Sequence, residues 1–196
     1  SKITIIENLL PKIDHLIVGG GMAYTFCRAL GAQTGRSMVE EEHQETARSI
    51  VQKAEEQGVQ IHLPADSLNA RAFANDSETE VTDMNTIGDE WMGLDVGPKT
   101  RLLNREVLLS SSVILWNGPV GVFEMSSFSE GTRQLGQAIV EATAKGAFSL
   151  VGGGDSVAAA KQFGFADKVS YVSTGGGAML EYLEGKELPG IQAILS

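Results

Sequence analysis

Short apolar runs alternate with longer amphipathic stretches along this chain. Each run contains β-branched residues and is followed by glycine, proline or a small polar residue. The runs are His15–Val18, Val59–Leu63, Val113–Trp116, Phe148–Val151 and Val169–Val172. Runs of this kind are typical of strands that are covered on both faces of a sheet. Their alternation with helical patterns predicts βαβ units and a parallel sheet.

Two of the intervening stretches have the spacing of amphipathic helices. Over Val39–Gln57 the apolar residues recur three and four positions apart, which predicts one buried helix face. Ser37 followed by Glu40 predicts a capping box at its start, and Gly58 fits its end. Phe128–Lys145 repeats the pattern and predicts a second long helix.

The remaining segments are less regular. Ile3–Ile13 has helical spacing but contains Pro11, and an interior proline costs about 3 kcal/mol, so we expect a kink or an early helix end. The polar stretch Ala74–Thr86 is expected to be a loop. Shorter helices are expected directly after three glycines: Gly21, Gly154 and Gly177.

These patterns predict an α/β fold with one domain over residues 1–196. The expected architecture is a Rossmann-like three-layer sandwich, in which helices cover both faces of a mostly parallel central sheet.

Composition restricts the partners. The formal net charge is −10, so the chain lacks the basic face that nucleic acid requires, and no nucleic acid partner is expected. A nucleotide is still possible, because backbone N–H groups at helix starts bind phosphates without lysine. No run of about 18 apolar residues occurs, so no membrane span is expected. Cys27 is the only cysteine, and a reducing, cytoplasmic location is the simplest expectation.

Glycine triplets are the most informative feature. Gly19–Gly21, Gly152–Gly154 and Gly175–Gly177 each follow a predicted strand and precede a predicted helix. In an open α/β sheet such turns lie at the carboxyl ends of the strands, where ligands bind. Helix-start N–H groups beside them would bind several phosphate oxygens. The alternative is that glycine only allows tight strand-to-helix turns.

Two common phosphate-binding motifs are absent. The chain has no G-x-x-x-x-G-K-[ST] motif, which excludes a P-loop enzyme. No triplet continues as the dinucleotide fingerprint, and Ser173 and Thr174 stand where an acidic residue would be needed. A nicotinamide-dependent dehydrogenase is therefore disfavoured.

Polar residues beside the turns have two interpretations each. Asp155 is either a helix N-cap or, beside phosphates, a ligand of Mg²⁺, and Ser156 adds a hydroxyl. Glu124 is either an ordinary helix-start acid or an acceptor for ribose hydroxyls. Taken alone, Lys2 is a solvated lysine. The three histidines have no spacing that predicts a zinc site.

Five sequence runs resemble the phosphoglycerate kinase family, in family order and spacing. They are Leu16–Met22, Trp91–Pro98, Trp116–Glu124, Val151–Ser156 and Ser173–Ala178, and the resemblance extends through Glu184–Gly190. Each run alone is weak evidence, whereas five together are very specific.

The resemblance implies a glycolytic phosphotransferase. Enzymes of the family transfer a phosphoryl group between 1,3-bisphosphoglycerate and ADP, giving 3-phosphoglycerate and ATP. A basic N-terminal domain binds the phosphoglycerate, and a C-terminal domain binds the Mg²⁺-bound nucleotide. This acidic chain resembles the C-terminal domain, so ADP or ATP, Mg²⁺ and a monomeric intact enzyme are expected.

The resemblance also assigns residues. Around the base and ribose it implies the turn and wall residues Gly20, Gly21, Tyr24, Gly93, Leu94, Asn117, Pro119 and Val120, with Glu124 on the ribose hydroxyls. Around the phosphates and Mg²⁺ it implies Lys2, Gly152, Gly153, Gly154, Asp155 and Ser156, with Gly175, Gly176 and Gly177 facing the transferred group. Lys2, Gly153 and Gly176 would be catalytic, and Asp155 would bind the metal.

The chain departs from the family in lacking the N-terminal domain and a glycine-lysine strand that precedes Ser1. That strand is expected near the middle of the sheet, and its loss would expose strand edges. We therefore expect a piece of a longer polypeptide, or a fragment paired with its missing part, that binds nucleotide without completing the reaction. A nucleotide-binding module without catalysis is the alternative, although the third triplet and Lys2 favour the enzyme.

Overall fold

The computed structural model describes residues 2–175. Its α-helices are α1 (Ile3–Leu9), α2 (Gly21–Ala29), α3 (Gln44–Gln57), α4 (Pro98–Leu109), α5 (Glu130–Ala144) and α6 (Gly154–Gln162). Short 3₁₀ helices are η1 (Leu10–Lys12), η2 (Glu41–His43) and η3 (Ser126–Phe128). The strands are β1 (His15–Ile17), β2 (Gln33–Thr34), β3 (Gln60–His62), β4 (Asp66–Ala70), β5 (Thr79–Asp83), β6 (Thr86–Ile87), β7 (Met92–Val96), β8 (Val113–Trp116), β9 (Phe148–Val151) and β10 (Tyr171–Val172).

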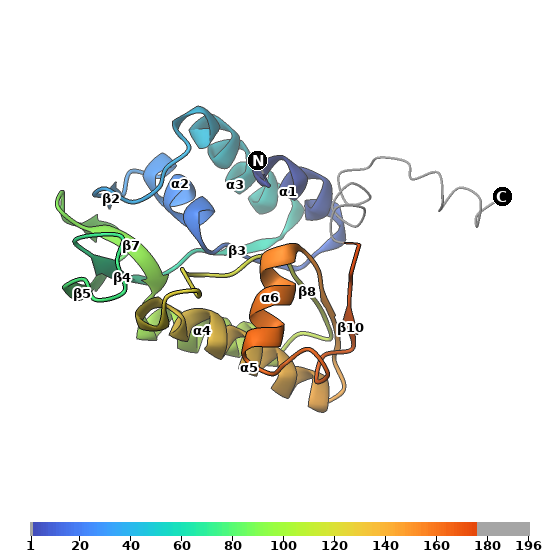
Figure 1. The fold of residues 1–196 in the computed structure, drawn as a ribbon. Helices are drawn as coiled ribbons and strands as arrows, with labels where there is room; N and C mark the ends of the chain where they lie inside the picture. The colour runs from blue at the N-terminus through green and yellow to red at the C-terminus, as the bar shows by residue number, and fades with distance from the viewer. Residues whose placement is uncertain (1, 176–196) are drawn as a thin grey trace.

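Most strand pairs are parallel. β1 pairs with β3, β8 and β10 flank β9, and β2 pairs with β6, all in parallel. The exception is an antiparallel sheet in the order β5–β4–β7. Helices α1, α2 and α3 lie on one side of the β1, β3 and β8 strands, and α4 and α5 lie on the other (Figure 1). The expected three-layer α/β fold is confirmed.

The parallel sheet is divided into two parts. Among the described residues β1 pairs only with β3, and β8 pairs only with β9, so one edge of each strand has no strand partner. The division falls between β1 and β8. A strand preceding Ser1, which the family resemblance places near the middle of the sheet, remains an expectation.

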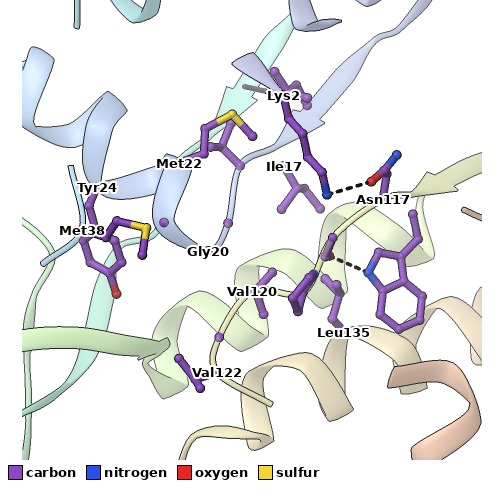
Figure 2. Close-up of a pocket in the computed structure, with 18 of the residues that line it drawn as sticks. Lys2, Ile17, Gly20, Met22, Tyr24, Met38, Asn117, Val120, Val122 and Leu135 are labelled. Carbon is purple, nitrogen blue, oxygen red and sulfur yellow. Dashed lines mark hydrogen bonds between the residues drawn. The ribbon is translucent and has the colours of Figure 1, made fainter. Parts of the chain in front are cut away.

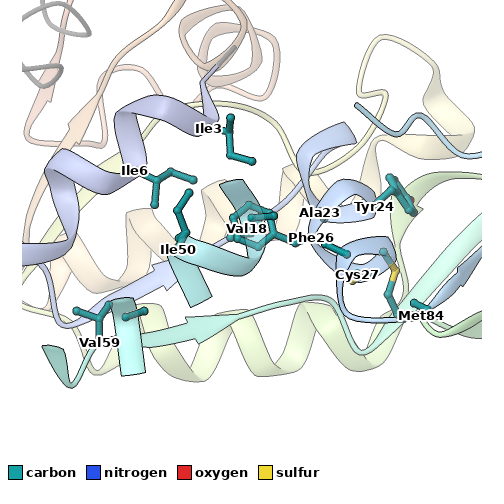
Figure 3. Packing of buried hydrophobic residues seen from close by; sticks show 14 of the residues in the cluster. Ile3, Ile6, Val18, Ala23, Tyr24, Phe26, Cys27, Ile50, Val59 and Met84 are labelled. Carbon is teal, nitrogen blue, oxygen red and sulfur yellow. The ribbon is translucent and has the colours of Figure 1, made fainter. Parts of the chain in front are cut away.

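Two large hydrophobic clusters support these parts separately. The first surrounds α2, where Phe26 packs with Ile50 of α3 and Met84, all fully buried (Figure 3). The second joins α5 to β8 and β9 through Ile139, Trp116 and other buried side chains. A third, small cluster of Ala70, Leu94 and Phe128 lies under the antiparallel sheet.

The helix ends agree with the local sequence signals, except for one predicted helix cap. Helix α1 ends before Pro11 and continues as η1, as expected from the missing N–H of proline. Gly58 ends α3 in the left-handed conformation at φ 72°. The predicted capping box is wrong, because α3 begins at Gln44 and no side chain caps it. The Ser37 hydroxyl instead accepts a hydrogen bond from the Gly93 amide at 2.8 Å.

The loop expected over Ala74–Thr86 is wrong in its second half, where β5 pairs with β4 and β6 begins. Along β5 exposed and partly buried residues alternate, as in a strand with one covered face. β4 was missed because it contains polar residues that are paired only in the folded chain. Asp66 accepts the amides of Lys99 and Thr100, and Asn69 donates to Thr82. Among residues 2–175, no helix has the length and apolar character needed to cross a membrane.

Candidate functional site

A largely apolar cavity of about 680 Å³ lies between the two parts of the sheet. Its walls include β1 and β8, the apolar side of α1, and α5 residues such as Leu135. Lys2 and Asn117 line one end of it, and the first glycine triplet and the turn over residues 117–122 also belong to its walls (Figure 2). The first glycine triplet thus lines the cavity, whereas Gly152, Gly153 and Gly154 do not.

The first triplet is shaped by contact with that turn. A side chain at Gly19 would collide with Val120, and Gly20 has φ 65°, which favours glycine. A Cβ on Gly20 would also lie 3.1 Å from the carbonyl oxygen of Pro119. Gly20, Pro119 and Val120 line the cavity together, so the glycines bring two chain segments together and do more than reverse the chain.

Tyr24 and Gly93 form one wall together. Tyr24 is buried, its hydroxyl lies 3.1 Å from Ser67 Oγ, and burial raises the pKa of the phenol. Any side chain at Gly93 would collide with the Tyr24 ring. Gly93 and Leu94 line the cavity in front of it. The structure thus brings together the three wall residues that the sequence predicted from different segments.

Lys2 lies close to the second triplet through Asn117. Its Nζ donates to Asn117 Oδ1 at 3.2 Å (Figure 2), and a Cβ on Gly153 would lie 3.0 Å from the same oxygen. The Gly118 amide donates to the buried Ser156 hydroxyl at 2.6 Å. Three segments therefore meet around Asn117: the end of β8, the start of α6 and the start of the described chain.

The second triplet leads from β9 into α6. Gly153 is the N-cap of α6 with φ 91°, and α6 starts at Gly154. Asp155 lies in the first turn and is exposed, and no side chain caps this helix. The N-cap interpretation of Asp155 therefore has no support in the geometry. Its carboxylate belongs to the first turn of α6, where the partial positive charge of the helix start stabilises it.

Three predicted parts of the site are less well placed. The first is the second triplet with Asp155 and Ser156, which does not line the cavity and contacts the cavity residues Asn117 and Gly118 from outside. Glu124 is exposed in the turn after Phe123 and does not line the cavity. Gly175 is exposed, and Gly176 and Gly177 lie outside the described residues. The role of the third triplet therefore stays a prediction.

Sequence reasoning missed several residues of the wall. Met22, Met38 and Val122 line the cavity beside the predicted residues (Figure 2). Met22 and Val122 adjoin predicted turn residues and could have been found by proximity. Met38 had no such signal, because it reaches Gly21 only through the fold.

Comparison with known proteins identifies the family. The family model described as phosphoglycerate kinase matches residues 1–186. The chain belongs to the phosphoglycerate kinase family. A phosphoglycerate kinase of Porphyromonas gingivalis is 58% identical over 194 residues, which cover 99% of this chain and 46% of that protein.

Solved phosphoglycerate kinases have the same fold. The structure from Coxiella burnetii superposes with a TM-score of 0.93 at 44% identity, over 97% of this chain and 49% of that one. The crystal structure from Pyrococcus horikoshii gives 0.82 at 30% identity, over 99% of this chain and 48% of that one. The chain thus spans about half the length of the phosphoglycerate kinases that it matches.

Proposed function

We propose that this chain is the nucleotide-binding half of a phosphoglycerate kinase. It would bind Mg-ADP or Mg-ATP while a phosphoryl group moves between 1,3-bisphosphoglycerate and ADP, giving 3-phosphoglycerate and ATP. The observation that supports this most directly is the contact of Lys2 with Asn117 at one end of an apolar cavity, with Gly153 and the start of α6 directly beside Asn117. That arrangement suits a ligand with a flat apolar base at one end and phosphates at the other.

The base would lie at the end of the cavity where the first triplet faces Gly93 and Leu94, away from the division between β1 and β8. Gly20, Gly21, Gly93 and Leu94 offer backbone and aliphatic surface without bulky side chains, and Tyr24 supports them from behind. Glycine allows the backbone to approach a planar ring closely. For Glu124, a ribose contact would require the ligand to extend beyond the cavity to the exposed turn.

The phosphates would lie between Lys2 and the start of α6. In this proposal the N–H groups at Gly153–Asp155 and the Lys2 ammonium, which lie on either side of Asn117, would stabilise the charge that develops during transfer. Asp155 would hold Mg²⁺, which when bound neutralises phosphate oxygens and orients them. Phosphoryl transfer needs mainly positioning and charge stabilisation, and the attacking oxygen is already anionic, so no general base is required.

The chain would not complete this reaction alone. We propose that the part of the relatives outside the match supplies the site for 3-phosphoglycerate, and that a strand of it fills the division between β1 and β8. The intact enzyme is proposed to be a monomer.

Calorimetric titration of the chain with Mg-ADP tests the proposal, with NADH as the control ligand. We expect one saturable site for Mg-ADP and none for NADH. Asp155→Ala should weaken Mg-ADP binding, while Asp76→Ala, an exposed aspartate between β4 and β5, should not. A well-folded chain that fails to bind Mg-ADP would rule the proposal out. Equal effects of the two substitutions would remove Asp155 from the site.

A further inference from the structure

Asp95 is a buried carboxylate at the end of β7 that the proposed mechanism does not use. Only 1% of its surface is exposed. Its Oδ1 accepts the Val96 amide at 2.8 Å, and its Oδ2 accepts the Gly131 amide in the first turn of α5 at 2.8 Å. Both oxygens are therefore used, and they join β7 to the start of a helix.

Two glycines leave just enough room for this carboxylate. A side chain at Gly121, in the turn that lines the cavity, would collide with Asp95. A side chain at Gly131 would collide with it as well. Asp95 therefore lies between the turn and α5, in contact with both.

Two further hydrogen bonds complete the same junction. The Val122 amide donates to the Leu94 carbonyl at 2.8 Å, and the Val120 amide donates to the buried Thr132 hydroxyl at 3.2 Å. Strand β7, the turn and the first turn of α5 are thus connected pairwise around Asp95. Leu94, Val120 and Val122 all line the cavity.

We propose that Asp95 is a positioning residue that sets the separation between the Gly93–Leu94 wall and the Pro119–Val122 turn, and thereby the affinity of the cavity for the base of the nucleotide. This inference rests on the proposed function. Burial of a carboxylate is costly, and here it raises the pKa of Asp95 to about 6. The nearest cation, Arg101, lies 4.0 Å away. Arg101 therefore compensates the negative charge of this carboxylate poorly. A role in positioning the two cavity segments accounts for a buried acid at this place.

Asp66 is a matched control for Asp95. It is also buried, on the neighbouring strand β4, and it accepts the amides of Lys99 and Thr100 at the start of α4, each at 2.9 Å. Neither partner lines the cavity. The two aspartates thus make the same kind of helix-start contact, and only Asp95 touches the cavity wall.

The experiment compares Asp95→Asn with Asp66→Asn in the intact polypeptide that contains this sequence. The Val96 and Gly131 amides bond to different oxygens of Asp95, and Asp95→Asn replaces one of these oxygens by an NH2 donor, so one of the two hydrogen bonds is lost in this geometry. We expect the dissociation constants of Mg-ADP and of adenosine to rise about tenfold in Asp95→Asn and to stay unchanged in Asp66→Asn. Loss of folded protein alone would lower the number of sites and leave the dissociation constant of the remaining sites unchanged.

Gly131→Ala provides a second variant if Asp95→Asn fails to fold. The added methyl displaces the carboxylate from the α5 side without altering a cavity residue, so it should weaken adenosine binding in the same way. Unchanged dissociation constants in a folded Asp95→Asn or Gly131→Ala protein would overturn the inference.

Hydrogen exchange separates this inference from the proposed function. The Val122 amide should lose protection in Asp95→Asn and keep it in Asp66→Asn, whether or not nucleotide is present. If wild-type protein binds neither Mg-ADP nor adenosine, the proposed function fails, while selective loss of Val122 protection would still support the positioning role. Equal protection in both variants would contradict that role.

Discussion

Side chains of the site fall into exposed charges and buried supports. Lys2, at one end of the cavity, and Asp155, in the first turn of α6, are exposed, whereas Tyr24, Asp95 and Ser156 are buried. Exposed charges contribute little to stability, so substituting them tests function with little disturbance of the fold. Substitution of a buried supporting residue affects both stability and function, so it needs controls that separate these two effects.

Lys2→Ala tests the electrostatic part of the proposal. We expect the turnover number of the intact polypeptide to fall about a hundredfold, because one preorganised positive group facing the transferred phosphoryl is removed. The melting temperature should stay close to that of the wild type, since Lys2 is exposed. Steady-state kinetics and thermal unfolding measure the two quantities.

Lys12→Ala is the control for that experiment, because Lys12 is an exposed lysine at the other end of the same helical segment and does not line the cavity. Similar turnover numbers in both variants would support the simplest interpretation, in which Lys2 is a solvated lysine without a role in the reaction.

Asp95 also predicts a pH dependence of stability. Desolvation raises its pKa from 3.8 to about 6 in the folded chain, so between these values the folded state binds more protons than the unfolded state. Its contribution is therefore fully present below about pH 4, falls as the pH rises through about 6, and is flat above that. Arg101 and Glu130 are the nearest charges that act on it, in opposite directions.

Denaturant unfolding of wild type and Asp95→Asn across this range isolates the contribution. The stability of the wild type relative to the variant should decrease by up to about 3 kcal/mol from about pH 4 to about pH 7. A difference that does not change with pH would show that Asp95 titrates near its ordinary value.

The helices and strands show what a single sequence reveals. Strands with continuous apolar runs, such as Val113–Trp116 and Phe148–Val151, were predicted with their bounds intact. The antiparallel strands β4 and β7 were missed, because polar residues such as Asp66 and Asp95 look unsuited to a buried strand until the helix-start amides that donate to them are in place. The apolar strands and amphipathic helices of the core were thus predictable, and the polar contacts that join them were not.

The same contrast holds for the candidate site. Its glycine turns and Lys2 were assigned from adjacent sequence runs and from the resemblance, and the fold brings the first triplet and Lys2 to one cavity, with the second triplet beside Asn117. Met38 and the supporting role of Asp95 depend on contacts between distant segments, which no local pattern contains.

Gly154→Ala distinguishes a ligand-binding turn from a merely tight one. Gly154 lies at the start of α6 without a positive φ, and an added Cβ meets no atom within 4 Å. Stability should therefore be unchanged or slightly raised, since alanine is the better helix former. Mg-ADP affinity should fall about tenfold, because the methyl would occupy the approach to the helix-start amides.

Calorimetric titration and thermal unfolding of Gly154→Ala check both quantities, with adenosine, which lacks phosphates, as the ligand whose affinity should not change. Unaltered Mg-ADP affinity in this variant would leave the second triplet with a structural role only.

The molecule as a whole consists of two main cores that meet at the cavity. Ile6 and Val18 belong to the first core and Trp116 and Ile139 to the second, and all four line the cavity. Among the described residues no strand pairing joins β1 to β8. A ligand in the cavity therefore contacts both cores at once.

Scanning calorimetry of this chain should show two unfolding transitions without ligand, one for each main core. Mg-ADP at a hundred times its dissociation constant should stabilise the folded chain by about 2.7 kcal/mol and bring the transitions together. A single transition without ligand would indicate that the two cores already unfold as one unit.

The contact of Asp95 with Gly121 and Gly131 has a consequence for how sequences diverge. The three positions share one small volume, so a change at one alters what the other two tolerate. Across related proteins they should behave as a correlated trio, in which a larger residue at position 121 or 131 appears only with a smaller one at position 95. The residues found at these three positions in related proteins would then indicate the width of the cavity.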